Sequence, residues 1–325
     1  MGSATGRDLH VDNLLSQVAI NYRPSGMIGD QIFPIVPVQK ETDSYPVFNR
    51  GEVFAIEKTL RTRTAEAMRV TRSVSSAQYA CKNYALAYDM PIEDRANMDA
   101  AFQFELEAGR VRYLTDKLML DMDRRILQTA RTNVATTFLC GSSWAAPGAS
   151  AGDPFSQIVQ AIEQVKGTTA ERPNSIIFGW RAYQWARRNL NMRNLINGTN
   201  NGRGIVSRQQ IQEALEVDRL LVAEAFFNPS NEAQTATFST VFPADAVLVY
   251  YAPLAPSRET PSFGYSFRWT SPELGTPFAA IRHPFESRTR VDGIEVQYYQ
   301  DERVTGSDYG VLIAGVGSAQ ATGLV

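Results

Sequence analysis

The segment from Lys40 to Asp89 alternates apolar residues with polar or charged ones, a pattern typical of extended strands and not of helices. The apolar and aromatic residues in it include Tyr45, Val47, Phe48, Val53, Phe54, Val70, Val74, Tyr79, Tyr84, Leu86 and Tyr88. A two-stranded ribbon is only marginally stable in water when it has nothing to pack against. Because no neighbouring segment has the pattern of a partner, we expect other copies of the same chain to hold this ribbon.

The middle of this ribbon is basic. Between Glu57 and Arg72, five basic residues minus two acidic ones give a local charge of +3. One interpretation is a solvated hairpin tip, since exposed strands often carry charge that prevents edge pairing. The alternative is an electrostatic contact with an acidic patch on a neighbouring molecule. The candidate residues for that inter-subunit contact are Phe54, Lys58, Arg61, Arg63, Arg69 and Arg72.

Downstream of Pro91, residues Asn97–Arg131 have the longest helical pattern in the chain. One face carries the apolar residues Met98, Phe102, Leu106, Val111, Leu114, Leu118, Met122, Ile126 and Ala130. Asn97 is suited to cap the helix, and the pair Asp121–Arg125 has the spacing that stabilises one. A helix of this length spans about 50 Å. We therefore expect a spine along one edge of a flat subunit.

The flanking regions give shorter signals. Apolar residues at helical spacing between Leu14 and Ile20 predict an amphipathic patch on an otherwise loose N-terminus, and three prolines within residues 21–39 predict an irregular extended segment. After a Gly- and Ser-rich break at 141–152, alternating helical and strand patterns predict an α/β or α+β domain around a small sheet. The predicted helices are Phe155–Lys166, Trp180–Asn189 and Ser207–Leu215. The predicted strands are Ser175–Phe178, Arg219–Ala225, Ala246–Tyr251, Ser262–Trp269, Arg288–Tyr299 and Val311–Val316.

Composition excludes several classes of protein. With 325 residues, 44% hydrophobic and 20% charged, the chain can bury a sizeable core over about two domains. A net charge of -2 argues against a sequence-independent nucleic-acid binder. Two distant cysteines, Cys81 and Cys140, make neither a disulfide framework nor a zinc site. No apolar run reaches the length of a membrane span, and the N-terminus lacks a signal-peptide pattern, so we expect cytosolic synthesis without export.

The chain offers little catalytic chemistry. His10 and His283 are its only histidines, and His283 stands in a turn-like Arg-His-Pro sequence with no recognisable catalytic constellation. A metal site built from His and Cys would need at least three ligands at compatible spacing. We therefore expect no catalytic residues, no cofactor, no metal site and no enzymatic activity.

Taken in order, these segments resemble the major capsid proteins of tailed bacteriophages that have the HK97-type fold. The stretches that carry the resemblance, besides the ribbon and the long helix, are Ile177–Trp180, Leu215–Val222, Val247–Tyr251 and Pro261–Trp269. The resemblance implies an α+β fold with an N-terminal arm, an extended β-hairpin called the E-loop, a P domain with a long spine helix, and an A domain. The corresponding residues are 1–39 for the N-terminal arm, 40–80 for the E-loop, 81–150 for the P domain with its spine helix at 97–131, 151–255 for the A domain, and 256–325 for a return to the P-domain sheet.

The resemblance also implies a function. Copies of the chain would form pentamers and hexamers of an icosahedral shell around the double-stranded DNA of a tailed phage, without sequence-specific DNA binding. It implies a protein made in the host cytoplasm and located in the virion capsid, with a separate scaffolding protein, a portal and cement proteins as further partners. With that family in view, we interpret the basic residues of the ribbon as an inter-subunit contact.

Two other functions stay open at this point. The same fold forms encapsulin-like compartments that hold protein cargo, and an α/β enzyme with an oligomerisation arm would also fit the pattern. Some members of the capsid family crosslink a lysine of the E-loop to an asparagine, but no partner for Lys58 can be matched, so we predict no crosslinking. Only about 20 residues precede the proline-rich segment, so we also expect no internal scaffolding segment.

Overall fold

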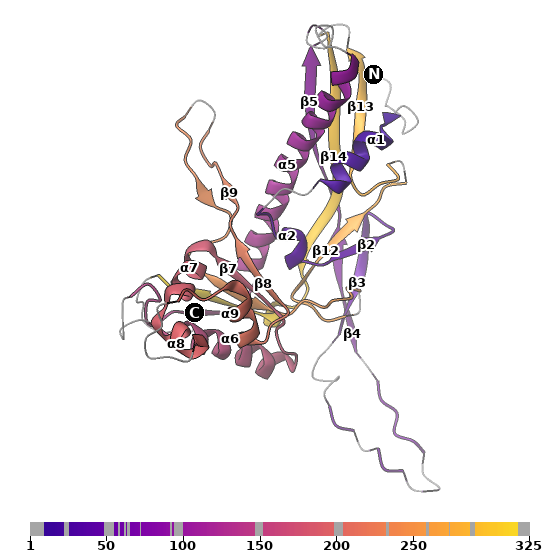
Figure 1. The fold of residues 1–325 in the computed structure, drawn as a ribbon. Coiled ribbons are helices and arrows are strands. Elements are labelled where there is room, and N and C mark those ends of the chain that lie inside the picture. The colour runs from indigo at the N-terminus through magenta and orange to yellow at the C-terminus, as the bar shows by residue number, and fades with distance from the viewer. Residues whose placement is uncertain are drawn as a thin grey trace.

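A computed structural model gives the fold of the chain (Figure 1). The structure describes residues 10–22, 26–48, 55–57, 59–61, 63, 66–71, 73–91, 93, 100–146, 152–197, 204–231, 234–257, 260–272, 274–286 and 290–317. Asn97, the predicted helix cap, lies outside these residues.

The first part of the fold is a long sheet in which the described strands have the order β1-β13-β14-β12-β2, with β5 also paired to β14. Its strands are β1 (His10–Val11), β2 (Ile35–Val38), β5 (Lys82–Pro91), β12 (Gly264–Trp269), β13 (Ala279–Glu286) and β14 (Val291–Val304). β14 is its centre: β5 pairs along one edge, while β13 and then β12 pair along the other. Strand β2 is an edge strand parallel to β12, a position that tolerates Pro37.

The predicted long helix is confirmed as α5 (Ala100–Thr132), 33 residues that run beside β5 and β14 in Figure 1. The helix packs against the long sheet, and its predicted apolar face is buried at Val111, Leu114, Leu118, Met122, Ile126 and Ala130. The predicted pair is also present, with Arg125 Nη1 2.5 Å from Asp121 Oδ2. Burial of that stripe, more than intrinsic helix propensity, stabilises a helix of this kind.

The second part is a shorter sheet with the strand order β6-β15-β11-β7-β8. Its strands are β6 (Thr136–Leu139), β7 (Ser175–Gly179), β8 (Arg219–Ala223), β11 (Val247–Tyr250) and β15 (Gly310–Ala314). Helices α6 (Pro154–Thr169), α7 (Trp180–Arg188), α8 (Leu190–Asn197) and α9 (Arg208–Leu215) supply the hydrophobic residues packed on one face. The other face packs in the same hydrophobic core as α5. This two-sided burial explains why β7, β11 and β15 are mostly apolar and do not alternate with polar residues.

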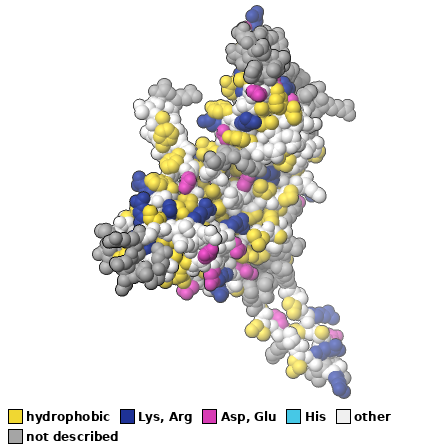
Figure 2. All heavy atoms as spheres, viewed as in Figure 1, with side chains coloured by type: hydrophobic (Ala, Val, Ile, Leu, Met, Phe, Trp, Pro, Cys, Tyr) yellow, Lys and Arg dark blue, Asp and Glu magenta, His cyan; other side chains and the backbone are white. Residues whose placement is uncertain are grey.

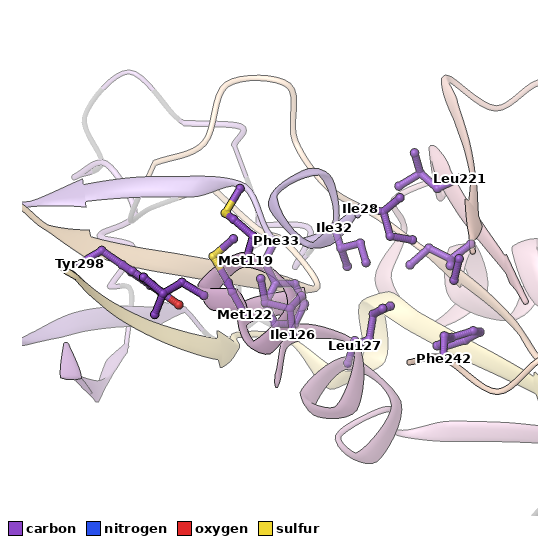
Figure 3. Close-up of a cluster of buried hydrophobic side chains, with 14 of the residues drawn as sticks. Ile28, Ile32, Phe33, Met119, Met122, Ile126, Leu127, Leu221, Phe242 and Tyr298 are labelled. Carbon is purple, nitrogen blue, oxygen red and sulfur yellow. The ribbon is translucent and has the colours of Figure 1, made fainter. Parts of the chain in front are cut away.

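One hydrophobic core joins the two sheets. It contains residues of α5, the long sheet, the short sheet and α2 (Gly29–Ile32). Figure 3 shows Met119, Met122, Ile126 and Leu127 of α5 between Tyr298 of β14 and the residues Leu221 and Phe242. The long helix therefore packs against both the long sheet and the short sheet.

The helical spacing predicted between Leu14 and Ile20 is confirmed by helix α1 (Asn13–Asn21). Asp12 caps this helix, because its carboxylate accepts hydrogen bonds from the amides of Leu14 and Leu15. Leu15 and Ala19 are fully buried against α5 and β13. The described part of the N-terminal region is therefore packed on the subunit and not loose, whereas residues 1–9 lie outside the described residues.

The strands of residues 256–325 are divided between the two sheets. β12, β13 and β14 lie in the long sheet, but β15 pairs with β11 and β6 in the short sheet. Three of the five residues of β15, Val311, Leu312 and Ile313, are buried hydrophobics, and the short sheet is covered on both faces. β6, which falls within the residues expected for the P domain, pairs with β15 and so lies in the short sheet.

The ribbon 40–89 also differs from the expectation, because two of its parts have partners in their own chain. β5 pairs with β14 over ten residues, from Lys82 to Pro91. β3 (Thr42–Phe48) and β4 (Val74–Ala80) form an antiparallel hairpin whose base packs on β12. We call residues 42–80 the arm; Figure 1 shows it projecting away from both sheets.

An aromatic cluster anchors the base of the arm. The Phe267 ring of β12 stacks on Tyr79 with a centroid distance of 4.7 Å, and Tyr45 lies 5.1 Å from the same ring. All three side chains are buried. Beside them, burial raises the pKa of the Cys81 thiol to about 12, so it stays protonated at neutral pH.

A buried carboxylate fixes the N-terminal region to the long helix. Asp123 of α5 is 1% exposed and accepts hydrogen bonds from the amides of Ile28, at 2.9 Å, and Gly29, at 2.5 Å. Burial raises the pKa of Asp123 to about 6, although the two amide donors lower it. The contact therefore provides acceptors for two amides but places a carboxylate in a dry site.

Replacing Asp123 tests the value of these two hydrogen bonds, which both end on Oδ1. Asp123→Asn keeps an oxygen that can accept from both amides, whereas Asp123→Ala leaves two buried donors without a partner. We expect Asp123→Ala to be less stable than Asp123→Asn by about 2–4 kcal/mol, measured by urea unfolding of unassembled subunits. Equal stabilities would show that the amides find other acceptors.

The pH dependence of stability provides a second test at the same residue. Because the pKa of Asp123 is about 6 in the folded chain and 3.8 ordinarily, the folded state binds this proton more tightly. The free energy of unfolding should therefore fall, relative to Asp123→Asn, as the pH rises from about 4 to about 6, by on the order of 2–3 kcal/mol. Parallel stability curves for the two proteins across this range would contradict the assignment.

The arm base can be tested with Phe267→Ala. We expect a loss of about 3–5 kcal/mol in the free energy of unfolding and faster amide exchange in β3 and β4, because the ring supports both strands. The matched control is Phe238→Ala, which removes a ring that is 75% exposed and should change stability by less than about 0.5 kcal/mol. Unchanged exchange in β3 and β4 would show that the ring does not hold the arm.

Candidate assembly surfaces

The arm beyond its base exposes apolar side chains. The described residues between β3 and β4 form no helix or strand. Among them the side chains of Ile56 and Leu60 are 99% and 97% exposed, and Met68 and Val70 are also exposed. Figure 2 shows hydrophobic and basic side chains together on this projection. An apolar surface concentrated on a projecting segment is typical of an interaction site.

The predicted contact residues lie on this same segment where the structure describes them. Arg61, Arg63 and Arg69 are exposed. Phe54, Lys58 and Arg72 lie outside the described residues. A single chain does not test a contact between subunits, so the role of all six residues stays a prediction.

A second hairpin projects from the short-sheet part of the chain, in the direction away from the arm (Figure 1). It is formed by β9 (Phe226–Phe227) and β10 (Ser239–Thr240). Phe227 is half-buried under the guanidinium group of Arg124 of α5, at 5.1 Å, whereas Phe226 and Phe238 are exposed. This hairpin leaves no pattern in the sequence, because its strands are only two residues long.

A polar cavity of about 720 Å³ lies where α5 crosses β5 and β14. Arg125 lines this cavity. Its Nη2 atom donates to a carboxylate oxygen of Glu302 at 2.9 Å and to the Tyr298 hydroxyl at 2.8 Å. The guanidinium carbon of Arg125 lies 3.5 Å from the centre of the Tyr84 ring. Burial raises the pKa of Tyr298, so its hydroxyl stays protonated. These groups bind one another and hold α5 on the sheet.

His283 lies in strand β13 and not in a turn, so that expectation is wrong. Its Nε2 atom is 2.7 Å from a carboxylate oxygen of Glu295 on the paired strand β14. Within the described residues, no group of three or more His, Cys, Asp or Glu side chains is placed to hold a metal ion. No helix among them has a stretch long and apolar enough to cross a bilayer.

Known proteins resemble this chain in sequence over most of its length. No family model matches the chain. It is 27% identical over 267 residues to the major capsid protein of Pseudomonas phage JBD67, covering 80% of this chain and 83% of the relative. It is 25% identical over 322 residues to the major capsid protein of Burkholderia phage BcepMu, covering 94% of this chain and 96% of the relative.

Solved structures share the fold at lower identity. A phage-related protein from Bordetella bronchiseptica RB50 matches with a TM-score of 0.73 and 20% identity, over 95% of this chain and 98% of that one. The capsid of cyanophage P-SCSP1u matches with a TM-score of 0.55 and 10% identity, over 91% and 90% of the two chains. The encapsulin of the holo-SrpI complex from Synechococcus elongatus PCC 7942 matches with a TM-score of 0.53 and 12% identity, over 96% and 98%. The chain therefore has the HK97-like fold and is related over most of its length to the major capsid proteins of phages.

Proposed function

We propose that the chain is the major capsid protein of a tailed phage and assembles with copies of itself into an icosahedral shell. The observation that carries this proposal is the arm, which is anchored at its base yet leaves Ile56 and Leu60 almost fully exposed. A neighbouring copy would cover these side chains. In this proposal the long sheet with α5 is the P domain, the short sheet with α6–α9 is the A domain, and the arm is the E-loop.

Burial of the arm would contribute strongly to assembly. Four exposed apolar side chains, Ile56, Leu60, Met68 and Val70, would each contribute about 1.5–3 kcal/mol when covered. Ordering of the arm offsets part of this gain. Because the shell is symmetric, the same contact recurs at every equivalent interface.

The basic residues of the arm would add specificity to this contact. Arg61, Arg63 and Arg69, together with Phe54, Lys58 and Arg72, would face a neighbouring subunit. Charged contacts across an interface steer association and fix its register, and salt screens them. Assembly driven partly by these residues should therefore weaken as the ionic strength rises.

We further infer that the shell encloses double-stranded DNA, built from pentamers and hexamers in the virion, after synthesis in the host cytoplasm. The support is that the two curated relatives are major capsid proteins of phages. The encapsulin match means that the fold alone does not separate a phage head from a compartment for protein cargo. The nucleic-acid content of purified particles separates them, because a cargo compartment would contain protein and little DNA.

Replacing exposed apolar side chains of the arm tests most directly whether a neighbouring copy covers them. We expect Ile56→Ser with Leu60→Ser to fold with a free energy of unfolding within about 0.5 kcal/mol of the parent chain. Assembly should fall at least about tenfold, because the neighbour no longer gains from covering these side chains. Size-exclusion chromatography and negative-stain microscopy measure the assembled fraction.

Thr59→Ser is the matched control, since it changes an exposed arm residue and removes only one methyl group of apolar area. Deletion of residues 53–74 is the stronger form of the test and should give folded subunits that do not assemble. Closed shells from the deleted chain would show that the arm is not the principal tie between subunits. Small uniform oligomers of the parent chain at every concentration would instead favour the enzyme with an oligomerisation arm.

A further inference from the structure

One face of the short-sheet part of the chain is basic. Residues 172–212 include no acidic residue. Helices α7 and α8 carry Arg181, Arg187, Arg188 and Arg193, of which Arg181 and Arg188 are exposed. None of the four forms an ion pair with a carboxylate of a described residue. We call these four arginines the basic edge.

Arg187 of the basic edge is positioned by its own chain. It donates from Nε to the Val206 carbonyl oxygen at 2.9 Å and lies over the Tyr183 ring. The Nε atom of Arg193 is buried with no hydrogen-bond partner among the described residues. Arg181 and Arg188, which are exposed, are therefore the arginines of the edge that another molecule can reach most directly.

The next segment along the chain has the opposite charge. From the last turn of α9 to the start of β8, the exposed acidic residues are Glu213, Glu216 and Asp218. Arg172 pairs with Glu216 at 2.8 Å, and no such pair is formed by Glu213 or Asp218 within the described residues. We call these three residues the acidic edge.

An open groove of about 590 Å³ adjoins the acidic edge. Its lining combines the apolar residues Phe155, Leu195, Ile196 and Ala214 with Gln210 and Glu213. Leu195 is 54% exposed, whereas Phe155 and Ile196 pack against the hydrophobic core of this part of the chain. Apolar side chains next to polar and charged ones are the usual composition of a protein interface.

The two edges lie at different places on the same layer of helices. Helix α8, which carries Arg193 of the basic edge, contacts α7, which carries the other three arginines, and α9, where the acidic edge begins. Figure 2 shows Lys and Arg side chains gathered over α7, and Asp and Glu side chains over α9 and α6. One molecule can therefore present both edges at once.

Two different, complementary patches on one chain are what a head-to-tail contact requires, and such contacts form a ring when the rotation between neighbours closes. We propose that the basic edge of one copy binds the acidic edge and its apolar groove on the next copy around a ring. This inference rests on the proposed shell function and adds the surfaces and the charges that join neighbouring copies. A second copy is favoured over nucleic acid because the same chain carries the complementary acidic surface, whereas phosphate binding would leave that surface without a role.

Charge reversal and its compensation test the proposal. Arg181→Glu with Arg188→Glu, and separately Glu213→Arg with Asp218→Arg, should each lower the assembled fraction at least about tenfold at low salt, because like charges then face each other. The four substitutions combined restore opposite charges, and assembly should return to within about threefold of the parent chain. Sedimentation velocity measures the assembled fraction, and circular dichroism verifies folding.

Arg181→Lys with Arg188→Lys is the matched control, since it keeps the charge and should assemble like the parent chain. Parent-like assembly of either reversed pair, or failure of the combined variant while it is folded, would overturn the proposal. A reversed basic edge that forms normal shells but retains less DNA would assign these arginines to nucleic acid instead. If the parent chain itself forms no shells, the proposed function fails and not merely this contact.

Discussion

The packing of α5 between the two sheets is the contact on which the rest of the subunit depends. Its apolar side chains belong to one core that also includes Tyr298 of the long sheet and Leu221 of the short sheet. The Arg125 network holds the same helix on β14, and Asp123 holds the N-terminal region. Because the two sheets are joined through α5, the projecting hairpins extend from a single body.

This arrangement explains how a ribbon of marginal stability can exist on the subunit. β5 is absorbed into the long sheet, and the rings of Tyr45, Tyr79 and Phe267 cover the base of β3 and β4. Beyond the base, apolar side chains face solvent. The subunit thus buries β5 and the base of the arm in its own sheet and core. The apolar side chains farther along the arm stay exposed and would be buried only by another molecule.

Local patterns predicted most of the elements, and long-range contacts account for the errors. The apolar face of α5 and the apolar–polar alternation of β12 and β14 are visible in the sequence, because each pattern repeats within a short stretch of residues. The pairing of β5 with β14 joins residues some 200 positions apart, as does the contact of Tyr79 with Phe267, and no window contains both partners. β13 was not predicted because Pro284 and His283 suggest a turn. The packing of α1 on α5 and β13 was not predicted because it joins segments that are far apart in the sequence. The basic residues of the arm were recognised because a cluster of like charges is visible in a short window.

Amide hydrogen exchange in residues 55–71, compared between unassembled subunits and assembled particles, tests most directly whether a neighbouring copy completes the arm. In free subunits these amides should exchange at nearly the rate of an unfolded chain, while amides of β3 and β4 are protected by the aromatic base. In particles, exchange in residues 55–71 should slow at least about a hundredfold. Equally fast exchange in both states would contradict the account, because the arm would then bind no neighbour.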